Sequence, residues 1–127
     1  MTHPVGTSLY ARLGGYDALA AAVDDLLPRL QGDPQIGAYW KGHNTHTKAR
    51  GRQMVLDFFV QALGGPAVYH GLDMKTAHHG LGITESDWAV MEGHAVAVLD
   101  KFGIQGRERE EFLAAAASLK GDIVQGH

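Results

Sequence analysis

The residues of this 127-residue chain best suited to chemistry lie in one stretch, Met74-Lys-Thr-Ala-His78-His79-Gly80-Leu81-Gly82-Ile83-Thr84. The stretch places an imidazole after a short turn with an apolar face, before a break marked by glycines and the start of a new helix. One ring nitrogen of a neutral imidazole can bind a metal, while a carbonyl fixes the N–H of the other. This pattern suits a protein that holds His78 rigidly over a flat ligand. The alternative is that His78 caps a short helix or packs in the core.

The neighbouring His79 is about 100° further round a helix, so the two imidazoles cannot bind the same face of one metal. We therefore expect His79 to be exposed. His43 and His46 form a His-x-x-His pair in a polar stretch. Two histidines with no cysteine and no close pair of carboxylates make a weak zinc site.

The elements that position these residues are predicted to be helices, because apolar residues recur at helical spacing and no stretch alternates as a strand does. Glycine and proline mark most of the helix ends. The expected helices are 7–13, 16–30, a short one through Ile36, Tyr39 and Trp40, 48–63, a short one at 73–79, one from 84 through Phe102, and one from about 106 to 124. The fold class is therefore all-α.

Several details of these helices are specific predictions. Pro28 should kink its helix or end it early, since proline removes a backbone donor and clashes with the preceding turn. Residues 41–47 are expected to form a loop. Thr84 and Asp87 have the spacing of a capping box. The inward stripe of the 48–63 helix is predicted to be Gly51, Val55, Phe58, Phe59, Ala62 and Leu63.

Composition limits the classes of function. The length predicts a single domain, 1–127, and 45% hydrophobic residues suffice for a core. The chain has no cysteine, which excludes disulfides and thiolate sites and fits a cytoplasmic protein. The net charge of −3 gives no basic surface for nucleic acid, and no apolar run is long enough to span a membrane. We expect neither a nucleic-acid partner nor a membrane.

Four motifs occur in order along the chain. They are Leu9-Tyr10-Ala11-Arg12-Leu13-Gly14-Gly15, Gly64-Gly65-Pro66, Tyr69-x-Gly71-x-x-Met74 followed four residues later by His78, and Gly93-His94. Together they resemble the truncated (group I) globins over roughly residues 8–124. The resemblance implies a two-over-two helical sandwich around haem b, with His78 as the axial ligand of the haem iron.

The same resemblance assigns the residues around the cofactor. The wall on the His78 side would be Met74, Ala77, Leu81, Ile83 and Trp88. Tyr39 and Trp40 lie where the family keeps a phenylalanine against the haem plane, and either could also lend an O–H or N–H to a ligand. His46 would be a sixth iron ligand only if its helix started later and the loop folded in.

The opposite, ligand-binding side departs from the family pattern. Leu27 stands where many members place a tyrosine. With Phe58 and Phe59 as anchors, Val55 matches the usual glutamine and Gly51 lies one turn earlier. A bound dioxygen carries partial negative charge and is stabilised by a hydrogen-bond donor. An apolar pocket therefore predicts ready binding of carbon monoxide and nitric oxide and poorer retention of dioxygen.

The function implied by the resemblance is binding of O2, NO or CO at haem iron. The protein would act as a carrier or sensor, or as a redox protein that removes nitric oxide or peroxide, for example a nitric-oxide dioxygenase or a peroxidase-like enzyme. Such turnover would need an external reductase. The alternative is a haemless globin-like helical module.

Overall fold

The structure is a computed structural model that describes residues 8–124, and every regular element within them is helical. In chain order these are α1 (Leu9–Arg12), α2 (Gly15–Gln31), the 3-10 helix η1 (Gly37–Trp40), α3 (Thr45–Ala62), α4 (Met74–His78), α5 (Glu85–Lys101), α6 (Gly106–Ala117) and α7 (Lys120–Ile123). No strand occurs in the described range, which confirms the all-α prediction. Thr7, expected to start the first helix, lies outside the described residues.

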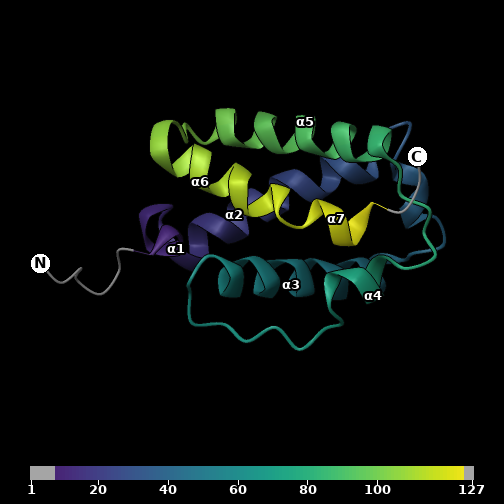
Figure 1. The fold of residues 1–127 in the computed structure, drawn as a ribbon. Coiled ribbons are helices and arrows are strands. Elements are labelled where there is room, and N and C mark those ends of the chain that lie inside the picture. Colours follow the sequence, from purple (N-terminus) through teal and green to yellow (C-terminus); the bar gives the residue numbers. More distant parts are fainter. Residues whose placement is uncertain (1–7, 125–127) are drawn as a thin grey trace, which may run out of the picture.

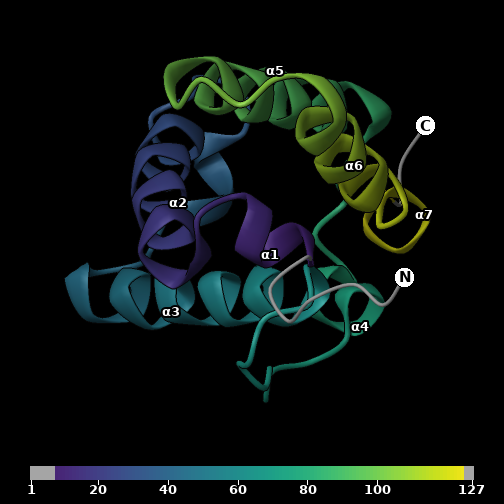
Figure 2. The same cartoon turned by 90° about the vertical axis from the view of Figure 1, so that its left-hand side faces the viewer.

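The long helix α2 is the centre of the arrangement. It packs against α1, α3, α5 and η1, while α1 also contacts α6 and α4 contacts α7. In Figure 1, α5 and α3 lie on opposite sides of α2. Figure 2 shows α6 across the molecule from α2, with α1 between them. Because so many of the other helices contact α2, its position determines where most of them lie.

The core lies mainly between α2 and α3. The side chains of Leu56 and Val60 on α3 are fully buried, with 0% of their surface exposed. Around them is a cluster of buried apolar residues from α2, the segment before η1 and the end of α3: Leu19, Val23, Leu27, Leu30, Ile36 and Leu63. These residues recur at helical spacing, so the amphipathic pattern alone brings the two helices together.

The predicted inward stripe of α3 is partly wrong. Leu56 and Val60 were absent from it, yet they are the two most buried residues of the helix, and Ala62 is exposed. Gly51, Val55, Phe58 and Phe59 are only half-buried. The reason is that α3 has two apolar faces. One packs on α2 and includes the predicted Leu63, and the rest of the predicted stripe lies along the other.

One predicted helix boundary is corrected, and of the two outcomes expected for Pro28 the early helix end does not occur. The segment 41–47 is not all loop, because α3 already begins at Thr45 after a capping box of Asn44 and Thr47. Pro28 does not end α2, which continues to Gln31. Proline at this position deprives only the Asp24 carbonyl of its helical partner. Asp24 is exposed to water, and the buried Leu27 and Leu30 hold the last turn on the core.

The last expected helix is two helices. Helix α6 ends at Ala117 and α7 begins at Lys120. The Ser118 hydroxyl donates a hydrogen bond of 2.6 Å to the Ala115 carbonyl, and such local bonds compete with helix continuation. By contrast, the Thr84–Asp87 capping box at the start of α5 is confirmed.

The Gly64-Gly65-Pro66 motif has a packing reason at Gly65. A Cβ at this position would lie 2.6 Å from Cγ1 of Val60 and 2.7 Å from the Tyr10 ring, closer than side-chain atoms approach. The Tyr10 backbone N–H donates to the Leu63 carbonyl at 2.8 Å. Glycine therefore lets α1 pack directly on the end of α3.

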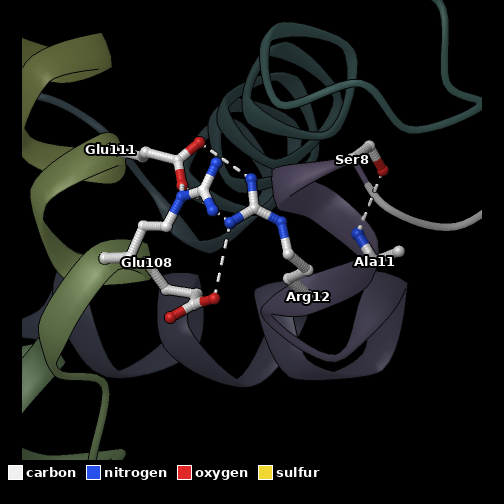
Figure 3. A network of polar contacts seen from close by, with 6 residues as sticks. Ser8, Ala11, Arg12, Glu108 and Glu111 are labelled. Atoms are coloured by element: carbon white, nitrogen blue, oxygen red, sulfur yellow. Dashed lines mark hydrogen bonds and ion pairs between the residues drawn. The ribbon is translucent and has the colours of Figure 1, made fainter. Parts of the chain in front are cut away.

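Helix α1 is joined to α6 by a cluster of charged side chains (Figure 3). The Arg12 guanidinium donates to both carboxylate oxygens of Glu111, at 2.7 and 2.8 Å, and to Glu108 at 3.4 Å. The ion pair raises the pKa of Arg12 and lowers that of Glu111. Because these groups are partly solvated, the ion pair adds little stability. The two parallel bonds between Arg12 and Glu111 mainly fix the orientation of α1 relative to α6.

Among residues 8–124, no helix combines the length and the apolar character needed to cross a lipid bilayer.

Truncation of Leu56 to alanine should lower the free energy of unfolding by about 2–5 kcal/mol, because it leaves a cavity at the fully buried contact between α2 and α3. Urea unfolding followed by circular dichroism measures the change. The matched control is Met54→Ala on the same helix, whose side chain is 44% exposed. An equal loss in both variants would contradict the assignment of the core to the Leu56 face.

Candidate functional site

His78 is the last residue of α4, a helix of five residues that starts at an N-cap. The Asp73 carboxylate accepts a hydrogen bond from the Thr76 N–H at 3.3 Å and so starts the turn. The His78 ring is half-buried, and its Nδ1–H donates to the Met74 carbonyl at 2.9 Å. A carbonyl can only accept, so Nδ1 carries the proton and Nε2 carries the lone pair. The imidazole is thus oriented as a metal ligand requires.

The residues after His78 redirect the chain. Gly80 has φ +83°, a left-handed conformation that glycine adopts without the steric cost of a side chain. His79 is exposed, as expected. The chain then enters α5 through the Thr84 cap. His78 is therefore held between two capped helix starts, those of Asp73 and Thr84.

The five residues predicted to form a wall near His78 differ in burial. Trp88 is buried on α5, while Met74 and Ile83 are half-buried. Ala77 is exposed, and Leu81 is 46% exposed in the turn that follows α4. Exposure of an apolar side chain as large as Leu81 beside His78 is compatible with contact to an apolar ligand.

The second apolar face of α3 carries four predicted site residues. Gly51, Val55, Phe58 and Phe59 are all half-buried. Phe59 packs on Phe112 of α6, with ring centroids 5.8 Å apart, so this face looks toward the C-terminal helices. An added Cβ at Gly51 would meet no atom within 4 Å. The face is apolar and has room at its first position.

Leu27 stays in the hydrophobic core and also borders solvent. It is one of the buried residues between α2 and α3. It also lines an open hollow of about 200 Å³ on the outside of these two helices, together with Asp24, Pro28, Gln31, Lys48, Ala49 and Arg52. The Arg52 guanidinium donates to both Asp24 oxygens, at 2.8 and 3.0 Å, on the wall of this hollow.

Tyr39 uses its hydroxyl within the protein. The O–H donates to Asp87 Oδ2 at 2.6 Å, and the Gln35 amide donates to Oδ1 at 2.7 Å. These bonds lower the pKa of Asp87 to about 2, and the bond from Tyr39 is the largest cause. Trp40 is half-buried and packs against the core. The suggestion that Tyr39 lends its O–H to a ligand is not what the structure shows, since the hydroxyl already has a charged acceptor.

His94 is a helix residue whose ring has a partner within the protein. Its Nε2–H donates to Asp33 Oδ2 at 2.8 Å, and this bond is the main cause of a lowered pKa of Asp33. Asp33 and Asp87 thus tie the segment around η1 to α5. No sequence signal pairs these residues with partners that lie 61 and 48 positions away.

The remaining histidine predictions find no support. His46 lies in the first turn of α3 and is exposed, so the later helix start that a sixth-ligand role required does not occur. His43 is exposed as well. In residues 8–124, no three histidine or acidic side chains gather as a metal site would need.

Comparison with known sequences identifies relatives over nearly the whole chain. Residues 8–125 match the family described as bacterial-like globin. A group 1 truncated haemoglobin of Mycolicibacterium paratuberculosis is 35% identical over 119 residues, which cover 94% of this chain and 85% of that protein. A group 1 truncated haemoglobin of Chlamydomonas moewusii is 31% identical, with coverage of 92% and 68%.

Solved structures show the same fold. The ferric truncated haemoglobin of Tetrahymena pyriformis superposes with a TM-score of 0.85 at 23% identity, over 93% of this chain and 98% of that chain. The 2/2 haemoglobin of Synechococcus sp. PCC 7002, solved with covalently attached haem, gives a TM-score of 0.82 at 22% identity, with the same coverage. The predicted two-over-two sandwich is confirmed.

Replacement of Tyr39 by phenylalanine should raise the pKa of Asp87 from about 2 toward the usual value near 3.9, because the strongest bond to the carboxylate is lost. A carboxyl with a depressed pKa in the folded state adds stability above pH of about 4, and that stability is lost as the pH falls toward about 2. The variant should therefore lose stability at neutral pH and depend less on pH between about 4 and 2.

NMR titration of the Asp87 carboxyl and acid unfolding measure the two effects. The control is Tyr16→Phe, which removes a hydroxyl that accepts an exposed hydrogen bond from Gln53. An unchanged Asp87 titration in Tyr39→Phe would show that the Tyr39 bond is not its cause.

Proposed function

This chain belongs to the bacterial-like globins, in the family of group 1 truncated haemoglobins, and on that premise we propose that it binds haem b through His78 and takes up diatomic ligands. When bound, haem supplies an iron atom to which O2, NO or CO can attach. The protein residues supply the axial ligand, the apolar surroundings and the polarity of the ligand pocket.

The observation that carries the proposal is the hydrogen bond from His78 Nδ1 to the Met74 carbonyl at 2.9 Å. It fixes the tautomer and limits rotation of the ring, so that the Nε2 lone pair has a defined direction. The same bond satisfies a carbonyl of the last turn of α4, which is also what a helix-capping histidine would do. The porphyrin supplies four equatorial nitrogens, so one protein ligand is sufficient.

The surrounding residues fit an apolar, flat cofactor. Phe58 and Phe59 on the second face of α3 are half-buried, as are Met74 and Ile83 around His78, and Leu81 is exposed. These large apolar side chains are only partly covered. Contact with a further apolar surface would remove them from water and lower the free energy. We assign Met74, Ala77, Leu81, Ile83 and Trp88 to the His78 side, and Leu27, Tyr39, Trp40, Phe58 and Phe59 to the rest of the pocket.

Gly51 and Val55 define the ligand side in this proposal, and neither can donate a side-chain hydrogen bond. The nearby polar groups have partners elsewhere. Tyr39 bonds Asp87, and the Gln53 amide donates to Tyr16 and Asp57 on the surface. The pocket should therefore favour ligands that need no donor, CO and NO, over long retention of O2.

Binding alone would make the protein a carrier or sensor of these gases. Repeated turnover of nitric oxide or peroxide would require an electron donor to return the iron to the ferrous state. An absorption spectrum after haem addition, followed by steady-state assays with and without a reducing system, separates the two roles.

Substitution of His78 by alanine should abolish the sharp Soret band obtained on haem addition, because the only proposed axial ligand is removed. The matched control is His79→Ala, which removes the adjacent, exposed imidazole and should leave the band unchanged. Titration of the apoprotein with haem, monitored in the Soret region, measures both. If neither variant differs from the wild type, or the wild type shows no saturable Soret change, the haem proposal is wrong and a haemless module remains.

Introduction of glutamine at Gly51 should slow dissociation of O2 about tenfold, since one hydrogen bond to a charged acceptor contributes about 1.4 kcal/mol or more. The position has room for the side chain, because an added Cβ meets no atom within 4 Å. Stopped-flow replacement of O2 by CO gives the rate. Gly51→Ala adds volume without a donor and should leave the rate near that of the wild type; equal rates in the two variants would place Gly51 away from the ligand.

A further inference from the structure

The cations of this protein are unevenly paired. Of its eleven lysines and arginines, seven form ion pairs with carboxylates in residues 8–124: Arg12, Arg29, Arg52, Lys101, Arg107, Arg109 and Lys120. Within the same range the other four, Lys41, Lys48, Arg50 and Lys75, have no carboxylate within ion-pair distance. Three of these four lie within ten residues of one another.

We call Lys41, Lys48 and Arg50 the α3 cation cluster. All three side chains are exposed, and every residue from 41 to 50 is exposed except Thr47, which is half-buried. Lys48 and Arg50 leave the first two turns of α3 about 200° apart around its axis, and Lys41 precedes the helix, so the cluster surrounds the N-terminal end of α3. Figure 2 shows this end extending past α2. Cations that find no partner within their own protein keep their full attraction for charges on another molecule.

The surrounding charge makes this end of the molecule distinct. From residue 34 to residue 56 the chain has four basic residues and no acidic one. The rest of the chain contains the other seven lysines and arginines and all fourteen acidic residues, so its formal net charge is −7. In space Asp24 lines the same hollow as Lys48, but its carboxylate is paired with Arg52. A protein with a positive end and a negative remainder orients an acidic partner during approach and repels it elsewhere.

The position of the cluster indicates what the partner does. Gly51 and Val55, which define the proposed ligand side, follow the cluster on the same helix. Val55 lies seven residues beyond Lys48, about 10 Å along the axis. A molecule docked on the cluster would be close to the proposed haem, and this part of the argument rests on the proposed function.

We propose that the α3 cation cluster is the docking surface for a small acidic electron-transfer protein that reduces the iron. One electron passes from a reduced iron–sulfur centre or flavin of the donor to ferric iron; the donor is oxidised by one electron and the iron becomes ferrous. A weak, charge-guided contact suits such transient encounters. Three cations are fewer than the four to eight typical of segments that bind anionic membranes.

The test uses the haem-loaded protein with reduced plant-type ferredoxin, a small acidic iron–sulfur protein, as donor. Stopped-flow absorbance under CO follows formation of the ferrous form. Electrostatic steering raises association rates about 10- to 1,000-fold. Removal of all three charges (K41Q/K48Q/R50Q) should therefore slow reduction at least about tenfold at low salt, and the wild-type rate should fall as salt is added.

The matched control is Lys75→Gln, which removes the one lysine or arginine outside the cluster that has no ion pair within residues 8–124. It should slow reduction less than Lys48→Gln does, although both variants lose one lysine charge. Dithiothreitol, an uncharged reductant, should reduce all variants at the same rate. Equal slowing in Lys48→Gln and Lys75→Gln, or a wild-type rate independent of salt, would overturn the proposal.

A second measurement does not depend on haem. A carbodiimide joins lysine amines to carboxylates in direct contact, so mass spectrometry should find links from Lys41 and Lys48, but not Lys75, to ferredoxin. The proposal is wrong if no such link forms, or if the protein instead binds phosphatidylserine vesicles through the cluster. It is also wrong if the triple variant loses haem affinity, which would assign the cations to the haem carboxylates. Absence of a Soret band, by contrast, would count against the proposed function alone.

Discussion

The packing of α2 on α3 is the contact on which the rest of the molecule depends. Leu56 and Val60 lose all solvent exposure there, and four buried residues of α2 surround them. Because α2 also contacts α1, α5 and η1, its position fixes theirs. The second apolar face of α3 is a consequence of the first. Once Leu56 and Val60 face α2, the helical period turns Gly51 and Phe58 to another side of the helix, the side on which we propose that haem binds.

Polar side chains in this fold are largely engaged in holding helices together. The Asp87 carboxylate accepts hydrogen bonds from Tyr39 and Gln35, and the Asp33 carboxylate accepts one from His94. The ion pair of Arg12 joins α1 to α6. In residues 8–124 no buried side-chain nitrogen or oxygen lacks a partner. The result is a proposed ligand pocket with few spare donors, next to a scaffold that is well supplied with them. Selectivity among gases would then come as much from the lack of a hydrogen-bond donor in the proposed pocket as from the side chains that line it.

Much of this could be predicted from local signals. The helices, the Thr84 cap and the orientation of His78 all follow from residues within a few positions of one another. The failures share a different cause. Periodicity cannot tell which of two apolar faces of α3 is buried, because the choice depends on α2. The Tyr39–Asp87 bond spans 48 positions, so it becomes visible only when the chain is folded.

Burial is distributed unequally among the helices. Helices α2, α3 and α5 contain buried side chains, whereas α4, α6 and α7 contain none. Segments with few buried contacts open at a lower free-energy cost than the whole protein unfolds. Amide hydrogens of α4 and α7 would therefore exchange with solvent long before those around Leu56. His78 belongs to this labile part, so its residence on a metal would be governed by local opening and not by the global stability of the globin.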